Sequence, residues 1–150
     1  MAPSIRLFAQ LLSTGLVLSF ALTASASDIG QIKVSKGDVS IERSGQTLQA
    51  AVGARVQTAD VIKTGGDGSV GITMSDNSLL SAGPNSVVSL DRFAFDAATN
   101  QGQFDTSPRR GSLSVVSGRI AKQSADAMTV RTPAAILGVR GTEFVVSVDD

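Results

Sequence analysis

Arg140, near the carboxyl end of the chain, has both the residue type and the setting for binding chemistry. Gly138 and Gly141 permit backbone angles that a side chain would forbid, and they bracket Val139 and Arg140 on a short turn. A guanidinium held in this way could contact a partner or an anion. The alternative is a structural role, in which it pairs with a carboxylate or with backbone carbonyls and holds the turn together. We favour the structural role.

Several loop carboxylates could also do chemistry. Asp60 stands at the start of a predicted strand, where an aspartate accepts turn hydrogen bonds more often than it binds a ligand. Asp67, Asp76 and Asn77 offer the oxygen ligands that calcium prefers, but they form no dense Asp-x-Asp-x-Asp run. Turn formation is therefore the favoured interpretation for all four residues.

The residue types that are missing exclude most enzymes. The chain contains no histidine and no cysteine. Ordinary zinc and copper sites, and Ser-His-Asp or Cys-His catalysis, are excluded for that reason. A carboxylate-only enzyme or a Ser-Lys pair would remain, and neither shows a local motif. We predict a protein that is not an enzyme and that has no cofactor, no catalytic residue and no metal site.

The first residues predict the compartment. Arg6 is the only charge before Asp28, residues 11–22 are mostly apolar, and Ala24-Ser25-Ala26 offers small residues for a signal peptidase. We expect residues 1–26 to be a cleaved signal peptide and residues 27–150 to form one periplasmic or secreted domain. A retained membrane anchor is the alternative, but the apolar stretch is shorter than the roughly 20 residues a span needs. The mature chain is expected to have no transmembrane helix.

Charge and aromatic content narrow the class of partner. The chain has 13 basic and 13 acidic residues, so loss of Arg6 leaves 12 against 13, a net charge of −1. Nucleic acid requires clustered lysine and arginine, and the basic residues here are scattered. With no tryptophan and no tyrosine, carbohydrate binding by ring stacking is also poorly supported.

The order of apolar residues and turn residues predicts an all-β fold. Short apolar segments recur about every eight to twelve residues and are separated by Gly, Asp, Asn and Pro, as in sandwiches and small barrels. Residues 31–35 and 39–43 are expected to form a hairpin in which Ile32 and Val34 share one face. Residues 96–110 are predicted to form a longer loop or an extended hairpin tip. The chain is expected to be a single β-sandwich domain.

The last part of the chain predicts two strands, at residues 128–132 and 143–148, joined by a bend of small residues. Pro133 has no backbone N–H and biases Thr132 toward extended geometry, so the first strand should stop there. Phe144 and the valines around it are expected in the core.

Residues 130–146 contain a Thr-Pro pair, a run of small residues and Val-Arg-Gly-Thr-x-Phe. This pattern resembles the FecR family, a periplasmic sensor-regulator domain first recognised in iron-dicitrate signalling. Earlier segments follow in the family's order, at residues 52–64, 68–78, 82–86 and 113–120. Ala59 and Asn77 stand where the family usually has glycine, and asparagine tolerates left-handed geometry better than most residues.

The resemblance implies a jelly-roll-like sandwich that acts as a binding or signalling module. It singles out Asp60 and a C-terminal set of residues, which are structural in the favoured interpretation and partner contacts in the other: Thr132, Pro133, Gly138, Val139, Arg140, Gly141, Thr142 and Phe144. Full signalling members also carry a sigma-factor-binding segment and a membrane helix. Because this chain shows only a cleavable signal, direct control of a sigma factor is not expected.

Family members commonly continue with β-structure beyond the strand that contains Phe144, whereas this sequence ends at Asp149-Asp150. We expect an open C-terminal sheet edge to which an envelope protein could add a strand. The alternative is that the two aspartates protect the edge by charge. In function, a protein-binding envelope domain is the first hypothesis, and a structural or ligand-binding module for a polymer or a small anion is the second.

Overall fold

The computed structural model describes residues 26–124, 126–141 and 143–149. The predicted signal peptide therefore lies almost wholly outside the described residues, as does Thr142 of the C-terminal motif. The described chain forms these strands: β1 (Asp28–Lys36), β2 (Val39–Arg43), β3 (Gln46–Gln49), β4 (Arg55–Gln57), β5 (Val61–Thr64), β6 (Ser69–Met74), β7 (Leu79–Ala82), β8 (Val87–Asp96), β9 (Gln101–Val116), β10 (Met128–Arg131), β11 (Ile136–Gly138) and β12 (Glu143–Val148). A single 3-10 turn, η1 (Ile120–Lys122), follows β9.

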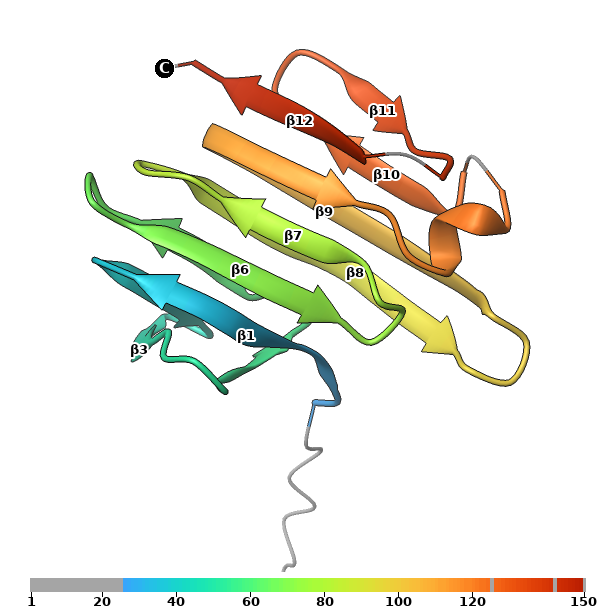
Figure 1. Ribbon diagram of the computed structural model, residues 1–150, viewed down its shortest axis with the longest axis horizontal. Helices are drawn as coiled ribbons and strands as arrows, with labels where there is room; N and C mark the ends of the chain where they lie inside the picture. Colours follow the sequence, from blue (N-terminus) through green and yellow to red (C-terminus); the bar gives the residue numbers. More distant parts are fainter. Residues whose placement is uncertain (1–25, 125, 142, 150) are drawn as a thin grey trace, which may run out of the picture.

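The strands form one sheet that folds over on itself into two layers (Figure 1). The front layer has the order β4-β1-β6-β7-β9-β12, and the back layer has the order β3-β2-β5-β8-β9-β10-β11. Both layers share β9, whose first half pairs with β8 and β10 and whose second half pairs with β7 and β12. The β9–β10 pair is parallel and the other described pairs are antiparallel. The all-β, sandwich-like, single-domain prediction is confirmed.

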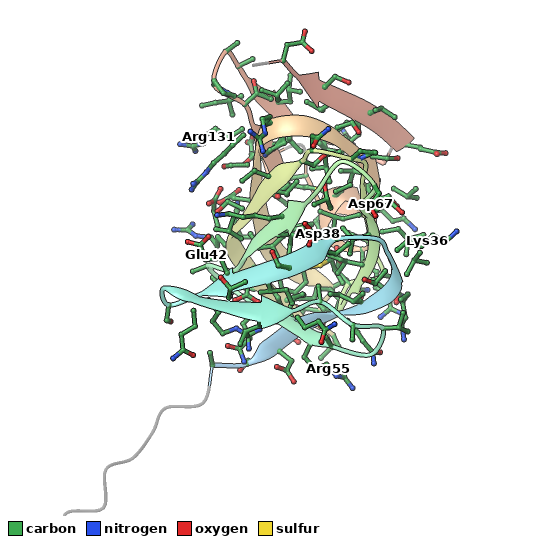
Figure 2. All side chains as sticks on the ribbon, turned by 90° about the vertical axis from the view of Figure 1, so that its left-hand side faces the viewer. Lys36, Asp38, Glu42, Arg55, Asp67 and Arg131 are labelled. Atoms are coloured by element: carbon green, nitrogen blue, oxygen red, sulfur yellow. The ribbon has the colours of Figure 1, made fainter. Side chains whose placement is uncertain are left out.

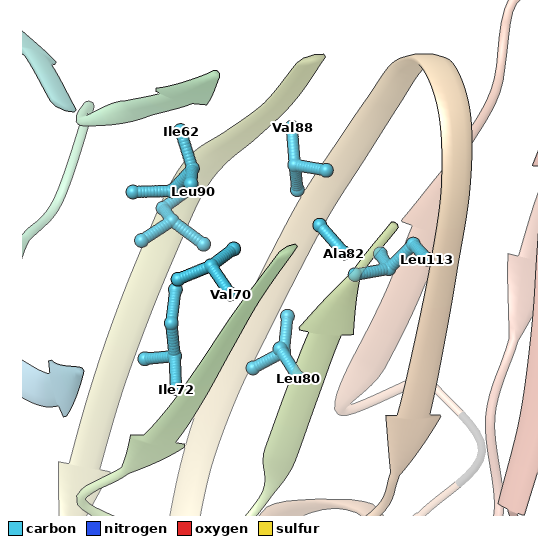
Figure 3. A pocket seen from close by; sticks show the side chains of 8 residues that line it. All are labelled: Ile62, Val70, Ile72, Leu80, Ala82, Val88, Leu90 and Leu113. Carbon is cyan, nitrogen blue, oxygen red and sulfur yellow. The ribbon is translucent and has the colours of Figure 1, made fainter. Parts of the chain in front are cut away.

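The hydrophobic core lies between the two layers. Side chains from β5 and β8 in the back layer meet side chains from β6, β7 and the second half of β9 in the front layer (Figure 3). The apolar gap left between them is only about 10 Å³, which is at the limit of what holds one water molecule. Charged side chains such as Lys36, Glu42, Arg55 and Arg131 point away from this core (Figure 2). This gap between the two layers of the described chain is therefore too small for a ligand.

The predicted hairpin between residues 31–35 and 39–43 is wrong. The strand β1 pairs with β4 and β6 in the front layer, while β2 pairs with β3 and β5 in the back layer. The chain crosses from the front layer to the back layer at Asp38. The Asp38 carbonyl accepts a hydrogen bond, at 2.9 Å, from the N–H of Gly65, which lies where the chain returns from β5 to β6 in the front layer. Alternation of apolar residues fits a hairpin and a crossing equally well, because both bury Ile32 and Ile41.

The expectation that Ile32 and Val34 share one face is also wrong. Ile32 is fully buried, whereas Val34 is 45% exposed. The register of β1 against β6 shifts between these two residues, which marks a bulge or a similar irregularity. An extra residue in one strand of a pair rotates the following side chain off the face that simple alternation assigns to it.

Residues 96–110 form an extended hairpin and not a loop. The strand β8 continues to Asp96 and β9 begins at Gln101, so only four residues make the turn between them. The polar composition of this segment reflects partly exposed strands. Phe104 is fully buried in β9, and its ring packs edge-to-face on Phe93 of β8 at 5.2 Å between centroids.

Candidate interaction surface

The chain reverses direction between β10 and β11 at the Thr-Pro pair. The Thr132 hydroxyl oxygen accepts hydrogen bonds from the N–H groups of Ala134 at 3.3 Å and Ala135 at 3.0 Å, and the Thr132 N–H donates to the Ala135 carbonyl at 2.8 Å. Pro133 is exposed, and β10 ends at Arg131, one residue before the predicted end at Thr132. The segment between β10 and β12 was predicted to be a simple bend. It contains a short additional strand, β11, which pairs with β10.

The motif continues from β11 into β12. Gly138 is the last residue of β11 and pairs with Thr129, and the N–H of buried Val139 donates to the Met128 carbonyl at 2.9 Å. Arg140 is exposed. Gly141 has φ +60°, in the left-handed region that the sequence predicted for it. Val139 therefore anchors the segment while Arg140 is displayed at the surface.

The strand β12 pairs with β9 along its whole length, and no other described strand pairs with it. Phe144 and Val146 are half-buried and pack against the core, but Val145 is 66% exposed. The prediction that the valines around Phe144 are core residues is therefore wrong for Val145. A strand at the edge of the sandwich alternates between an inward and an outward face, and the polar residues Glu143 and Ser147 flank Val145 on the outward one.

A surface groove lies between the ends of the two layers, next to β12. It has a volume of about 340 Å³ and is lined by Leu137, Gly138, Val139, Arg140, Phe144, Val145 and Val146. Among the lining residues, Leu137 is 40% exposed, and Ile136, which precedes it in β11, is 64% exposed. We call this region, residues 136–140 and 143–149, the β11–β12 surface. Sequence reasoning missed Ile136, Leu137 and Val145, and the polar–apolar alternation of β12 was the available signal for Val145.

Asp60 is not part of this surface. It is fully buried next to β5, and Arg43 of β2 donates to both of its carboxylate oxygens, from Nε at 2.8 Å and from Nη2 at 2.7 Å. The Gln57 N–H donates to the same carboxylate at 2.8 Å. The hydrogen bond with Asp60 raises the pKa of the Arg43 guanidinium. Asp60 thus closes the turn between β4 and β5 and ties it to β2.

Asp76 also acts within a turn. Its carboxylate is fully buried and accepts hydrogen bonds from the Ser78 N–H at 3.0 Å, the Ser78 hydroxyl at 2.8 Å and the Ile120 N–H at 3.2 Å. Asp67 accepts a hydrogen bond from the Asp38 N–H at 3.2 Å. Across the described ranges no group of three or more carboxylates could hold a metal ion. Asp76 thus connects the β6–β7 turn to η1, and Asp67 connects the β5–β6 turn to the β1–β2 turn.

Ala59 and Asn77 both occupy left-handed turns. Ala59 has φ +72° and Asn77 has φ +67°. Asparagine adopts this conformation at modest cost, so the Asn77 turn is retained. Alanine has no polar side chain to offset the crowding of its Cβ, and its strain is maintained by the neighbouring hydrogen bonds, including the Ala59 N–H to the Leu90 carbonyl at 2.7 Å.

We therefore predict that Ala59→Gly stabilises the protein. Relief of the left-handed alanine is worth about 1–2 kcal/mol, and the greater freedom of glycine in the unfolded chain removes about half of that. The expected net gain is about 0.5–1 kcal/mol, seen as a higher urea midpoint with an unchanged slope. Asn77→Gly is the matched control and should change stability by less. Equal or lower stability of Ala59→Gly would show that the turn carries no such strain.

Within the ranges that the structure describes, no helix has the length and apolarity of a membrane span. A search of curated proteins and a search of solved structures found no match. A family model described as FecR protein matches residues 60–150, which is more than half of the chain and runs from Asp60 through β12. The chain therefore belongs to the FecR family, whose members are signalling and regulatory domains of the cell envelope.

Proposed function

We propose that this chain is a non-catalytic periplasmic or secreted domain that binds an envelope protein by accepting a strand at β12. Residues 1–26 act as the cleaved signal peptide, and residues 27–150 form the binding domain. The observation that carries the proposal is the edge position of β12, together with 66% exposure of Val145 beside the groove. Unpaired backbone groups along such an edge form hydrogen bonds with an incoming strand, and the adjacent groove accepts its side chains.

Two further features support a surface partner over an interior ligand. The space inside the sandwich is about 10 Å³, far below the few hundred Å³ of a small-molecule pocket. The groove of the β11–β12 surface also brings together Leu137 and Val145, two exposed apolar side chains. Clusters of this kind are typical of interaction sites, whereas exposed apolar residues that stand singly are ordinary.

A polar hollow favours the second candidate function, recognition of an anionic polymer or a small anion. It has a volume of about 510 Å³ where the β8–β9 turn approaches η1, and it is lined by Ala97, Asn100, Arg119, Lys122 and Gln123. Two cations and two amides suit an anion, since all four can donate hydrogen bonds. Saturable heat on calorimetric titration with inorganic phosphate or an acidic polysaccharide would support this candidate.

The test of the first candidate is Val145→Lys in the mature protein. Lysine on an edge strand opposes strand addition, so we expect at least about a tenfold loss of partner recovered from an envelope extract. Val52→Lys is the matched control, because Val52 is 64% exposed but lies in the turn before β4. Both variants should melt close to the parent, since surface substitutions change stability little. Equal recovery by the parent and both variants would contradict strand addition at β12.

A further inference from the structure

The outer face of the back layer has a polar hollow that is separate from the β11–β12 surface and from the hollow beside η1. It has a volume of about 520 Å³ and is lined by residues of three neighbouring strands, β8, β9 and β10: Asp91, Arg92, Asp105, Ser107 and Arg131. We call it the β8–β10 hollow. In Figure 2, Arg131 points outward on the same side of the molecule as Glu42, whereas Lys36 points to the opposite side. The strands β6 and β7 of the front layer have no charged residue. The charged side chains of the middle strands therefore gather on the face that contains this hollow.

An irregularity in β8 shapes the β8–β10 hollow. The register of β8 against β9 shifts at Asp91, which is an extra residue on β8. Such a bulge bends the strand and turns a side chain away from the direction that alternation assigns to it. Arg92 of β8 stands opposite Asp105, and Arg131 follows the last paired residue of β10. The two arginines thus rise from the strands on either side of β9, on the order of 10 Å apart. Asp105 and Ser107 of β9 form the floor between them.

The two carboxylates in the hollow are held in place by hydroxyl groups. Asp91 accepts hydrogen bonds from the Ser89 hydroxyl, at 2.8 Å, and from the Ser107 hydroxyl. Asp105 accepts a hydrogen bond from the Thr129 hydroxyl at 2.6 Å. A hydroxyl is a neutral donor, so it fixes the position of a carboxylate without neutralising its charge. Both carboxylates can therefore still attract a positively charged group.

The two arginines of the hollow do not close onto these carboxylates. Arg92 Nε lies 4.0 Å from Asp105 Oδ2, which is too long for a hydrogen bond, and the Arg92 side chain is 68% exposed. Arg131 is exposed and forms no hydrogen bond or ion pair with the rest of the described chain. On the same layer, Lys63 does form a hydrogen-bonded ion pair with Glu42, which lowers the pKa of the Glu42 carboxyl. The hollow thus differs from an ordinary surface ion pair, because its guanidinium groups keep donors for a ligand.

The balance of charge in the hollow indicates the class of ligand. A simple anion would meet Asp91 and Asp105, and a simple cation would meet Arg92 and Arg131, so like charge opposes each of them. We propose that the β8–β10 hollow binds a small zwitterion, in which an acidic group and an ammonium stand on the same carbon atom or on adjacent ones. The arginine forks match the paired oxygens of a carboxylate or a phosphate, and the aspartates accept the ammonium N–H groups. The volume admits an amino acid or the head group of a phospholipid.

Titration of four small probes into the mature protein, followed by NMR of the backbone amides, tests this site. The zwitterions are alanine and O-phosphoethanolamine, and the singly charged probes are acetate and ethylamine. We expect saturable shifts in β8, β10 and the first half of β9 with at least one zwitterion, at an affinity at least about tenfold above that for acetate or ethylamine. Binding of alanine would assign an amino acid as the ligand, and binding of O-phosphoethanolamine would assign a lipid head group.

Three outcomes of this titration would overturn the proposal. The first is no saturable binding of either zwitterion. The second is equal affinity for acetate and the zwitterions, because the aspartates would then contribute nothing. The third is a set of shifts confined to η1 and the β8–β9 turn, which would place binding in the hollow beside η1.

Two arginine variants locate the binding. Arg131→Ala should weaken binding of the preferred zwitterion at least about tenfold, because charge-assisted hydrogen bonds are lost. Arg109→Ala is the matched control, since Arg109 of β9 is also an exposed arginine but does not line the hollow. Both variants should melt close to the parent, because both substitutions are at the surface. An equal loss of affinity in the two variants would mean that only the overall charge matters, and would reject the site.

Asp91→Asn tests the part that recognises the ammonium. Asparagine keeps an acceptor oxygen for the hydroxyls but removes the negative charge. We expect the affinity for the zwitterion to fall and the affinity for acetate to rise, so that the preference between them narrows. An unchanged preference would reject recognition of a zwitterion. These results are independent of strand addition at β12, which Val145→Lys tests.

Discussion

Arg43→Ala is expected to lower the free energy of unfolding by about 2–3 kcal/mol, because it leaves the fully buried Asp60 carboxylate without its cation, while the 28% exposure of the Arg43 side chain reduces the cost below that of a fully buried pair. The Asp60 carboxylate is fully buried and would lose both guanidinium hydrogen bonds, at 2.8 and 2.7 Å. The Gln57 N–H would remain as a donor but cannot neutralise the charge. Arg43 also donates to the Arg55 carbonyl at 3.1 Å, so the link from β2 to β4 would weaken as well.

Equilibrium urea unfolding measures this loss of stability, and two further variants serve as comparisons. Arg43→Lys keeps the charge but not the planar fork, so it should recover only part of the stability. Lys63→Ala removes a neighbouring pair, between Lys63 and Glu42, in which both side chains are more than 40% exposed. That change should cost less than about 1 kcal/mol. If Arg43→Ala costs no more than Lys63→Ala, the Arg43–Asp60 pair does not hold the β4–β5 turn.

Gly111→Ala is expected to have the second large effect, a loss of about 3 kcal/mol. Gly111 lies in β9 where this strand passes from the back layer to the front layer, and it has φ +81°. An added Cβ would lie 2.6 Å from the Ser86 Cα and 2.8 Å from the Asn85 carbonyl oxygen. Left-handed backbone costs a non-glycine residue about 1–2 kcal/mol, and the backbone overlap adds a cost of similar size.

Gly141→Ala is the control that separates these two terms. Gly141 has φ +60°, but an added Cβ would meet nothing within 4 Å. It should therefore lose only the conformational term, about 1 kcal/mol. Thermal or urea unfolding of the two variants gives the difference directly. Equal losses would mean that the corner at Gly111 opens easily, and that the layers are not tightly joined there.

The sequence predicted most of what depends on local chemistry. Pro133 marked the end of β10, and the glycine of the Val-Arg-Gly-Thr motif predicted the left-handed backbone at Gly141. Substitution of asparagine for a family glycine at residue 77 predicted a retained turn. These features depend on the allowed backbone angles of one or two residues, which the residue type determines before any tertiary contact forms.

Pairing between strands was predicted poorly where two arrangements bury the same residues. Ile32 and Ile41 face the core whether β1 and β2 form a hairpin or lie in opposite layers. The choice depends on Gly65 and Asp38, whose hydrogen bond joins residues 27 positions apart. Val34 left its expected face because of the register shift between β1 and β6, which no local pattern in β1 indicates.

By itself, the sequence determined the all-β class, the FecR family, and several of the turns, because alternation and turn residues act over a few neighbouring positions. Only the tertiary structure decided which layer each strand joins, that Arg43 pairs with the buried Asp60, and that β12 is an edge strand with Val145 exposed. The physical reason is that these features depend on contacts between segments distant along the chain. Their geometry is set by how the whole sheet folds over at β9.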